Sequence, residues 1–194
     1  MENKQKEIYD KIKNRFIKIV NENGLNTTLI KIESRGLTAK EAIGNTERKD
    51  YPILIGNEVM LQANYKGSIG QAFTPEPVAF SGTIEDVLEM DLDNDLRNRG
   101  IFIATINAVL RYLNLSTSSI HCKDKEPGLC AIKYLEFLNE NYSNKKVLLV
   151  GLQPGILSQI KKRGNVRVLD LNPENIGKVK ESILIEDGLE KYDE

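Results

Sequence analysis

The segment Lys146-Val-Leu-Leu-Val-Gly-Leu-Gln-Pro-Gly155 decides the expected fold of the second half of the chain. Its first part is apolar and rich in valine, which predicts a buried strand over 146–150. Glycines in a tight turn and proline at the first position of a helix are typical of a strand that passes directly into a helix. Backbone N–H groups at such a corner can face an anionic or polar ligand. Gly151, Gln153 and Pro154 are therefore candidate ligand-binding residues.

Strands and helices alternate on both sides of this corner. A helix is expected over 130–141, and the corner is followed by an expected strand over 166–169, a helix near Asn175 and a strand over 183–185. This order implies parallel strands joined by crossover helices. The second half therefore predicts a short, Rossmann-like α/β sheet.

Asp170 is a further candidate in this half. It follows Gly151 by 19 positions (170 minus 151), at the end of the next strand. Dinucleotide-binding and related folds place there the carboxylate that accepts hydrogen bonds from a ribose. However, the segment lacks the G-x-G-x-x-G series, and Pro154 removes a donor from the turn. The alternative is structural: glycine and proline form the corner, and Asp170 caps a helix that begins at Pro173.

The first half of the chain predicts an α+β domain. An opening helix that ends at Asn23-Gly24 is marked by apolar residues at every fourth position: Ile8, Ile12, Phe16 and Val20. Alternating residues predict strands over 28–32, 59–65 and 69–73 in an antiparallel meander. Helices are expected from Thr83 and over 93–113. We expect domains at 1–115 and 116–194, with the boundary in the loop 116–127.

A loop candidate lies in the segment Gly70-Gln-Ala-Phe-Thr-Pro75. It places polar side chains and an aromatic ring beside rigid elements, where ligand contacts are frequent. The candidate residues are Gln71, Phe73 and Thr74, although the segment is equally typical of a turn that fixes the path of the chain. Asn107, inside the expected helix over 93–113, is expected to be a buried polar group that needs a partner.

Length and composition describe a globular protein. The chain has 194 residues, 40% of them hydrophobic, and its 27 Lys and Arg and 28 Asp and Glu give a net charge of -1. The basic residues are scattered, so no nucleic-acid-binding surface is expected. No apolar run approaches the length of a membrane span, and the first residues are charged where a signal peptide is apolar. We therefore expect a cytoplasmic protein without membrane association.

The densest group of possible metal ligands is His121-Cys-Lys-Asp-Lys-Glu-Pro-Gly-Leu-Cys130, which contains the only histidine and both cysteines. Imidazole, thiolate and carboxylate together suit a borderline or soft metal, so a divalent transition metal is the expected cofactor. The candidate metal ligands are His121, Cys122, Asp124, Glu126 and Cys130. The alternative is that Cys130 packs as a small apolar residue, while Asp124 and Glu126 favour the N-terminus of the following helix.

Several of these segments, taken together, resemble a family of uncharacterised prokaryotic proteins to which heavy-metal chelation is ascribed. The resemblance is carried, in order, by Gly36-Leu-Thr-Ala39, Gly70-Gln-Ala-Phe-Thr74, Gly82-Thr83, Asn107-Ala-Val109, His121-Cys-Lys-Asp-Lys-Glu-Pro127, Val150-Gly-Leu-Gln-Pro154 and Asp170-Leu-Asn-Pro173. It implies an enolase-N-terminal-like domain before a Rossmann-like domain, with a ligand site in the cleft between them. It also adds Asn172 to the candidate ligand-binding residues. Members of that family continue with further strands after the position of Gly188, so the resemblance implies a short member or a sheet that another chain completes.

Two functions are expected from the candidate residues. The first is a small-ligand binding protein that holds a metal ion or metal chelate through His121, Cys122 and Cys130. Asp124 and Glu126 would then serve as oxygen ligands or would orient the other ligands. The second is an enzyme that uses a nucleotide or S-adenosylmethionine-like ligand at 151–155, with Cys122 or His121 as the reacting group. A nucleophilic Cys122 would need a lowered pKa.

A third expectation is a structural or partner-binding subunit. Three parallel strands form a thin sheet with an exposed edge, which a second copy of the chain can cover. A homo-oligomer is therefore the expected assembly, and the residues leave open whether the protein is an enzyme.

Overall fold

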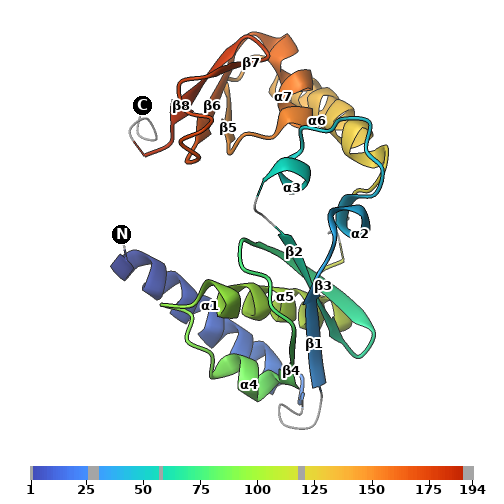
Figure 1. Ribbon diagram of the computed structural model, residues 1–194, viewed down its shortest axis with the longest axis vertical. Coiled ribbons are helices and arrows are strands. Elements are labelled where there is room, and N and C mark those ends of the chain that lie inside the picture. Colours follow the sequence, from blue (N-terminus) through green and yellow to red (C-terminus); the bar gives the residue numbers. More distant parts are fainter. Residues whose placement is uncertain (1, 26–30, 57–58, 118–120, 190–194) are drawn as a thin grey trace. The chain divides into compact units, whose positions relative to one another are not determined.

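The computed structural model describes residues 2–25, 31–56, 59–117 and 121–189 (Figure 1). The chain forms two compact units, the first made of residues 1–42 and 56–121 and the second of residues 43–55 and 122–194. The predicted domains, 1–115 and 116–194, are each one continuous segment of the chain. In the compact units, the segment 43–55 instead belongs with the C-terminal part of the chain.

The first unit contains a four-stranded antiparallel sheet, of which the alternating residues predicted three strands and not the one at 80–83. Its strands are β1 (Lys31–Gly36), β2 (Val59–Tyr65), β3 (Ser68–Thr74) and β4 (Phe80–Thr83), in the order β3-β2-β1-β4. All neighbouring pairs are antiparallel, and Gln62 of β2 stands opposite Arg35 of β1 and Gln71 of β3. The predicted strand over 28–32 is seen from residue 31 onward, because residues 26–30 lie outside the described residues.

Helices α1 (Glu2–Glu22), α4 (Ile84–Leu88) and α5 (Leu96–Tyr112) pack against one face of this sheet. Phe16 and Val20 of α1 are buried as predicted, whereas Ile8 is 56% exposed. The predicted start at Thr83 is confirmed, since Thr83 and Asp86 form a capping box at the beginning of α4. Asp95 caps α5 by accepting a hydrogen bond of 2.9 Å from the N–H of Arg97.

Two short helices follow β1. They are α2 (Ala39–Ile43) and α3 (Pro52–Ile55), and α3 lies in the segment 43–55 that joins the second unit. This segment is tied to its unit by a hydrogen bond of 2.9 Å from the N–H of Asp124 to the oxygen of Ile43. An ion pair of 3.6 Å between Arg48 and Glu181 adds a second link.

The second unit combines helices with a mixed sheet (Figure 1). Its elements are α6 (Glu126–Tyr142), β5 (Val147–Val150), α7 (Pro154–Ile160), the 3-10 helix η1 (Lys161–Arg163), β6 (Val166–Asp170), β7 (Val179–Lys180) and β8 (Ile183–Asp187). The strand order is β5-β6-β8-β7. The pairs β5–β6 and β6–β8 are parallel as predicted, whereas β7–β8 is antiparallel. The core is formed by Leu138, Leu157, Ile160, Val168 and Ile185.

Two predictions for this unit are wrong. The strand over 146–150 is not buried, because Leu148 and Val150 are 47% and 66% exposed. β5 is an edge strand that turns alternate residues toward the core. The helix expected near Asn175 is a turn, in which the N–H groups of Asn175 and Ile176 donate to the oxygen of Asn172. Gly177 then adopts φ +77°, and the chain enters the β7–β8 hairpin instead of a crossover helix.

Within the described residues, no helix combines the length and apolar character needed to cross a membrane.

Candidate functional site

The two cysteines are brought together in the second unit. Cys122 lies in the loop before α6 and is half-buried, while Cys130 lies in the first part of α6 and is exposed. The thiol of Cys122 is within hydrogen-bonding reach of the thiol of Cys130. Burial raises the pKa of the Cys122 thiol, and the charge and hydrogen bond of Cys130 and the charge of Glu126 raise it further. The structure therefore contains a pair of adjacent thiols, of which Cys130 is open to solvent.

The two acids between the cysteines bond to the backbone around this pair. Glu126 accepts a hydrogen bond of 2.9 Å from the N–H of Lys123, which closes the loop against the start of α6. Asp124 accepts one of 2.7 Å from the N–H of Asn45, and its own backbone has φ +56°. Both carboxylates thus hold the loop in shape through bonds to backbone N–H groups.

The fifth predicted metal ligand, His121, is assigned to the other unit. Its Nε2 lies against the main-chain oxygen of Ala42, so this nitrogen carries the proton and donates. His121 belongs to the first unit, whereas Cys122 to Cys130 belong to the second. The described part of the chain contains no group of three or more His, Cys, Asp or Glu side chains placed to hold one metal ion. The five-residue ligand set therefore stays a prediction, and the part of it that the structure describes in the second unit is the pair of thiols with its two nearby carboxylates.

The predicted corner is present between β5 and α7. Gly151 adopts φ +81° and donates its N–H to the oxygen of Leu169 at 2.7 Å. Pro154 is the first residue of α7, and Gln153 precedes it as an exposed residue without a side-chain capping bond. The corner thus forms as predicted, because Gly151 adopts a positive φ and Pro154 begins the helix.

The carboxylate of Asp170 is used inside this corner. It accepts hydrogen bonds from the N–H of Leu152 at 3.1 Å, the N–H of Asn172 at 2.9 Å and the side-chain amide of Asn175 at 3.0 Å. The side chain of Asn172 in turn accepts one of 2.9 Å from the N–H of Glu174. These bonds hold the ends of β5 and β6 together. The helix from Pro173 that Asp170 was expected to cap is a turn over 173–177, and ribose binding by Asp170 stays a prediction.

The three candidate residues of the segment 70–75 lie on two faces of β3. Gln71 and Phe73 line one cavity in the first unit, together with Asn107 and His121. Thr74 is 3% exposed and points instead toward α5, where a methyl group on Gly100 would stand 3.1 Å from its Cβ. Asn107 is exposed rather than buried, but it does have a partner, because its side-chain amide donates to the oxygen of Gln71 at 2.8 Å.

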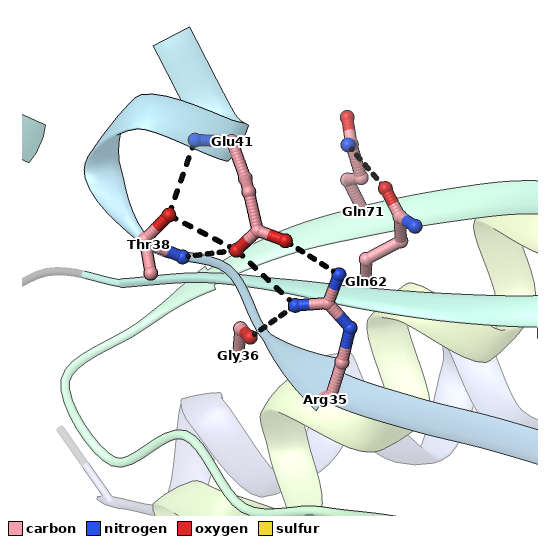
Figure 2. A network of polar contacts seen from close by, with 6 residues as sticks. All are labelled: Arg35, Gly36, Thr38, Glu41, Gln62 and Gln71. Atoms are coloured by element: carbon pink, nitrogen blue, oxygen red, sulfur yellow. Dashed lines mark hydrogen bonds and ion pairs between the residues drawn. The ribbon is translucent and has the colours of Figure 1, made fainter. Parts of the chain in front are cut away.

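Figure 2 shows a polar row on the face of the first sheet that lies away from its helices. Arg35 forms a two-bond ion pair with Glu41, with N–O distances of 2.7 and 3.2 Å. Glu41 and Thr38 exchange the bonds of a capping box at the start of α2. The hydrogen bond from Arg35 and then those from Thr38 lower the pKa of Glu41 to about 2. Across the sheet, the Gln71 amide donates to Gln62 at 3.0 Å.

Arg35 and Glu41 were missed as an ordered polar network, although the spacing Thr38-x-x-Glu41 is a capping-box pattern that could have indicated it.

Comparison of the chain with protein-family models, curated proteins and solved structures finds no match.

Proposed function

We propose that this protein binds a soft transition-metal ion, or a small chelate of such an ion, through Cys122 and Cys130. The observation that carries the proposal is the contact between the two thiols at the start of α6, with Cys130 open to solvent. Thiolates are the side-chain ligands that select soft ions such as Cu(I) and borderline ions such as Zn(II). A pair of thiols already in contact is close to the arrangement that one ion requires.

The small number of protein ligands favours a chelate or an ion of low coordination number. Two thiolates satisfy a linear Cu(I) ion, whereas Zn(II) needs about four ligands and would take the others from water or from a bound small molecule. Glu126 and Asp124 support the pair by fixing the loop through the N–H groups of Lys123 and Asn45. Their role in the proposal is to orient the thiols rather than to supply the metal-binding atoms.

The resemblance to proteins with ascribed heavy-metal chelation is in accord with this proposal. It would make the first unit an enolase-N-terminal-like domain and the second a Rossmann-like domain. The antiparallel sheet with helices on one face and the parallel β5–β6–β8 core are compatible with these two assignments. Both assignments are part of the proposal.

The test is elemental analysis of protein purified without chelator or affinity tag, followed by Cu(I) and Zn(II) titration under reducing conditions. We expect near-stoichiometric retention of metal by the wild-type chain. Cys122→Ser, Cys130→Ser and the double variant should lose it, while Glu140→Gln on the same helix serves as the matched control. His121→Ala measures whether the imidazole contributes. Retention by the double variant, or no binding by the reduced wild-type chain, would overturn the proposal.

The enzymatic alternative is less well supported. A nucleophilic Cys122 requires a lowered pKa, whereas burial and Cys130 raise the pKa of this thiol. The carboxylate that would hold a ribose, Asp170, already accepts three hydrogen bonds from its own corner. A thermal-shift screen with adenosine and S-adenosylmethionine would revive this alternative if either compound stabilised the protein.

One observation favours the subunit alternative as an addition to metal binding. β5 lies at the edge of its sheet, and its outward residues Leu148 and Val150 are 47% and 66% exposed. An apolar edge strand is a surface on which a second copy of the chain can pair across a twofold axis. Light scattering should show a dimer that Val150→Lys dissociates, and a monomeric wild-type chain at high concentration would exclude this assembly.

A further inference from the structure

A cavity of about 290 Å³ lies in the first unit at the outer edge of β3. Its described lining comes from β3, α5, Met60, Ser116 and His121, all within the first unit. At ~30 Å³ per water molecule, this volume holds about ten waters or a metabolite with roughly ten non-hydrogen atoms. Neither thiol and no residue of the β5–α7 corner lines it, so its use does not depend on the proposed metal centre.

At Gly70, the backbone of β3 comes close to the backbone of α5. A methyl group at position 70 would stand 2.1 Å from the nitrogen of Ala108 and 2.2 Å from the oxygen of Ala104, both main-chain atoms of α5. Asn107 then bonds the main-chain oxygen of Gln71 at 2.8 Å. In an antiparallel strand the N–H and C=O of one residue point to the same side, so the Gln71 N–H also faces this outer edge.

The electric charge of the cavity is positive. Arg111 follows Asn107 by one turn on α5 and lines the cavity, and the described residues of the lining include no Asp or Glu. Within the part of the chain that the structure describes, no ion pair engages the Arg111 guanidinium. His121 uses its Nε2 to donate to Ala42, which leaves Nδ1 as its second nitrogen. The guanidinium is therefore the group best suited to an anionic ligand, and its planar fork matches a carboxylate.

The opposite wall of the cavity is apolar. Ile69 and Phe73 flank Gln71 on the same side of β3, since alternate residues of a strand share a face. These two side chains are 42% and 57% exposed, and Met60 of β2, which stands opposite Phe73, also lines the cavity. A ligand with only a charged group would leave this surface in contact with water, whereas an apolar body would cover it.

From these observations we infer that the cavity binds a small organic carboxylate with an apolar body. Its carboxylate would lie on the Arg111 guanidinium, within reach of the Asn107 side chain and the Gln71 N–H. Its aromatic or branched aliphatic body would lie against Ile69 and Phe73. The chemistry of the walls thus defines the class of ligand: one negative charge at one end and about one ring or chain at the other.

The experiment is an NMR titration of the ¹⁵N-labelled full chain with benzoate and with hexanoate, compared with benzamide and inorganic phosphate. We expect a carboxylate to shift the amide signals of 69–73 and 107–111. Benzamide has the shape of benzoate without its charge, and it should bind at least about tenfold more weakly because the charge-assisted bond is lost. Phosphate, which has the charge without the apolar body, should also bind more weakly.

Variants locate the effect on the cavity. Arg111→Met should weaken carboxylate binding about tenfold or more, whereas Arg15→Met, an exposed arginine on α1, should leave it unchanged. Phe73→Asp should also abolish binding, and this exposed position tolerates the change. The double variant Cys122→Ser and Cys130→Ser should bind as the wild type does, which separates this site from the metal proposal. Failure of both carboxylates to shift these signals, or equal binding of benzamide, or equal losses in the two arginine variants, would overturn the inference.

Discussion

Gly155 of α7 lies directly against the ring of Tyr51: a methyl group at position 155 would stand 2.9 Å from the Tyr51 hydroxyl oxygen and 3.0 Å from its Cε1. Tyr51 is 9% exposed and belongs to the segment 43–55, which precedes most of the first unit in the sequence. The glycine after Pro154 therefore serves packing, because only a residue without Cβ admits the tyrosine ring.

We expect Gly155→Val to destabilise the second unit by about 1–3 kcal/mol, because the added side chain must displace Tyr51 from its buried position. The free energy of unfolding in urea measures the effect. Limited proteolysis should show faster cleavage within 43–55 in the variant. Gly128→Ala is the matched control, since a methyl group there meets nothing within 4 Å and alanine favours the helix α6. Equal stabilities of Gly155→Val and the wild type would contradict the packing role.

The close approach of β3 and α5 leads to a second prediction. Gly70→Ala should cost about 3 kcal/mol or more, because its methyl group would meet main-chain atoms of α5 that cannot move independently. The loss should be visible as a lower midpoint of urea unfolding. It should exceed the effect of Gly100→Ala, where the nearest atom is the Thr74 Cβ at 3.1 Å. The reverse order of the two variants would show that β3 and α5 separate easily.

Acid stability should depend on Glu41. Its pKa is lowered from 4.5 to about 2, first by the hydrogen bond from Arg35 and then by those from Thr38. Since the pKa is lower in the folded state, ionised Glu41 stabilises the protein above about pH 4.5, and this stabilisation is lost as the pH falls toward 2.

The free energy of unfolding should therefore decrease less steeply between pH 4.5 and 2 for Glu41→Gln than for the wild type. Glu33→Gln, an exposed acid on the preceding strand, is the control for the change in net charge. Parallel pH profiles for wild type and Glu41→Gln would show that the network of Figure 2 does not persist in solution.

Metal binding by the thiol pair should strengthen as the pH rises. The thiolate is the ligand, and burial together with Cys130 raises the pKa of Cys122, so binding must remove protons that are firmly held near neutral pH. Competition with a Cu(I) chelator between about pH 6 and 9 should show a rising apparent affinity. Calorimetry in buffers of different ionisation enthalpy should detect the released protons. A pH-independent affinity would mean that groups other than these thiols hold the metal.

Much of the fold was predictable because it rests on local patterns. The separation of Phe16 and Val20 by four residues predicted α1, and the alternation of apolar residues in 59–73 predicted β2 and β3. Thr83 predicted the start of α4. The corner at Gly151 and Pro154 was also predictable, since positive φ and a fixed first-turn φ belong to those residue types. The prediction of a helix near Asn175 was wrong because the chain forms a turn at Asn172 and then a left-handed residue at Gly177, which leaves no room for a helix.

The candidate sites were predictable only in part. The sequence by itself determined that the histidine and both cysteines fall within one short segment, and it thereby indicated a soft-metal centre near α6. Only the tertiary structure decided that Cys122, in the loop before α6, lies next to Cys130 on the helix. The same holds for the cavity at β3 and for the place of Tyr51, whose partners lie far away in the chain. Local residue types set helices, strands and turns through backbone preferences, but long-range contacts depend on how the apolar faces of those elements pack, which no short stretch of sequence specifies.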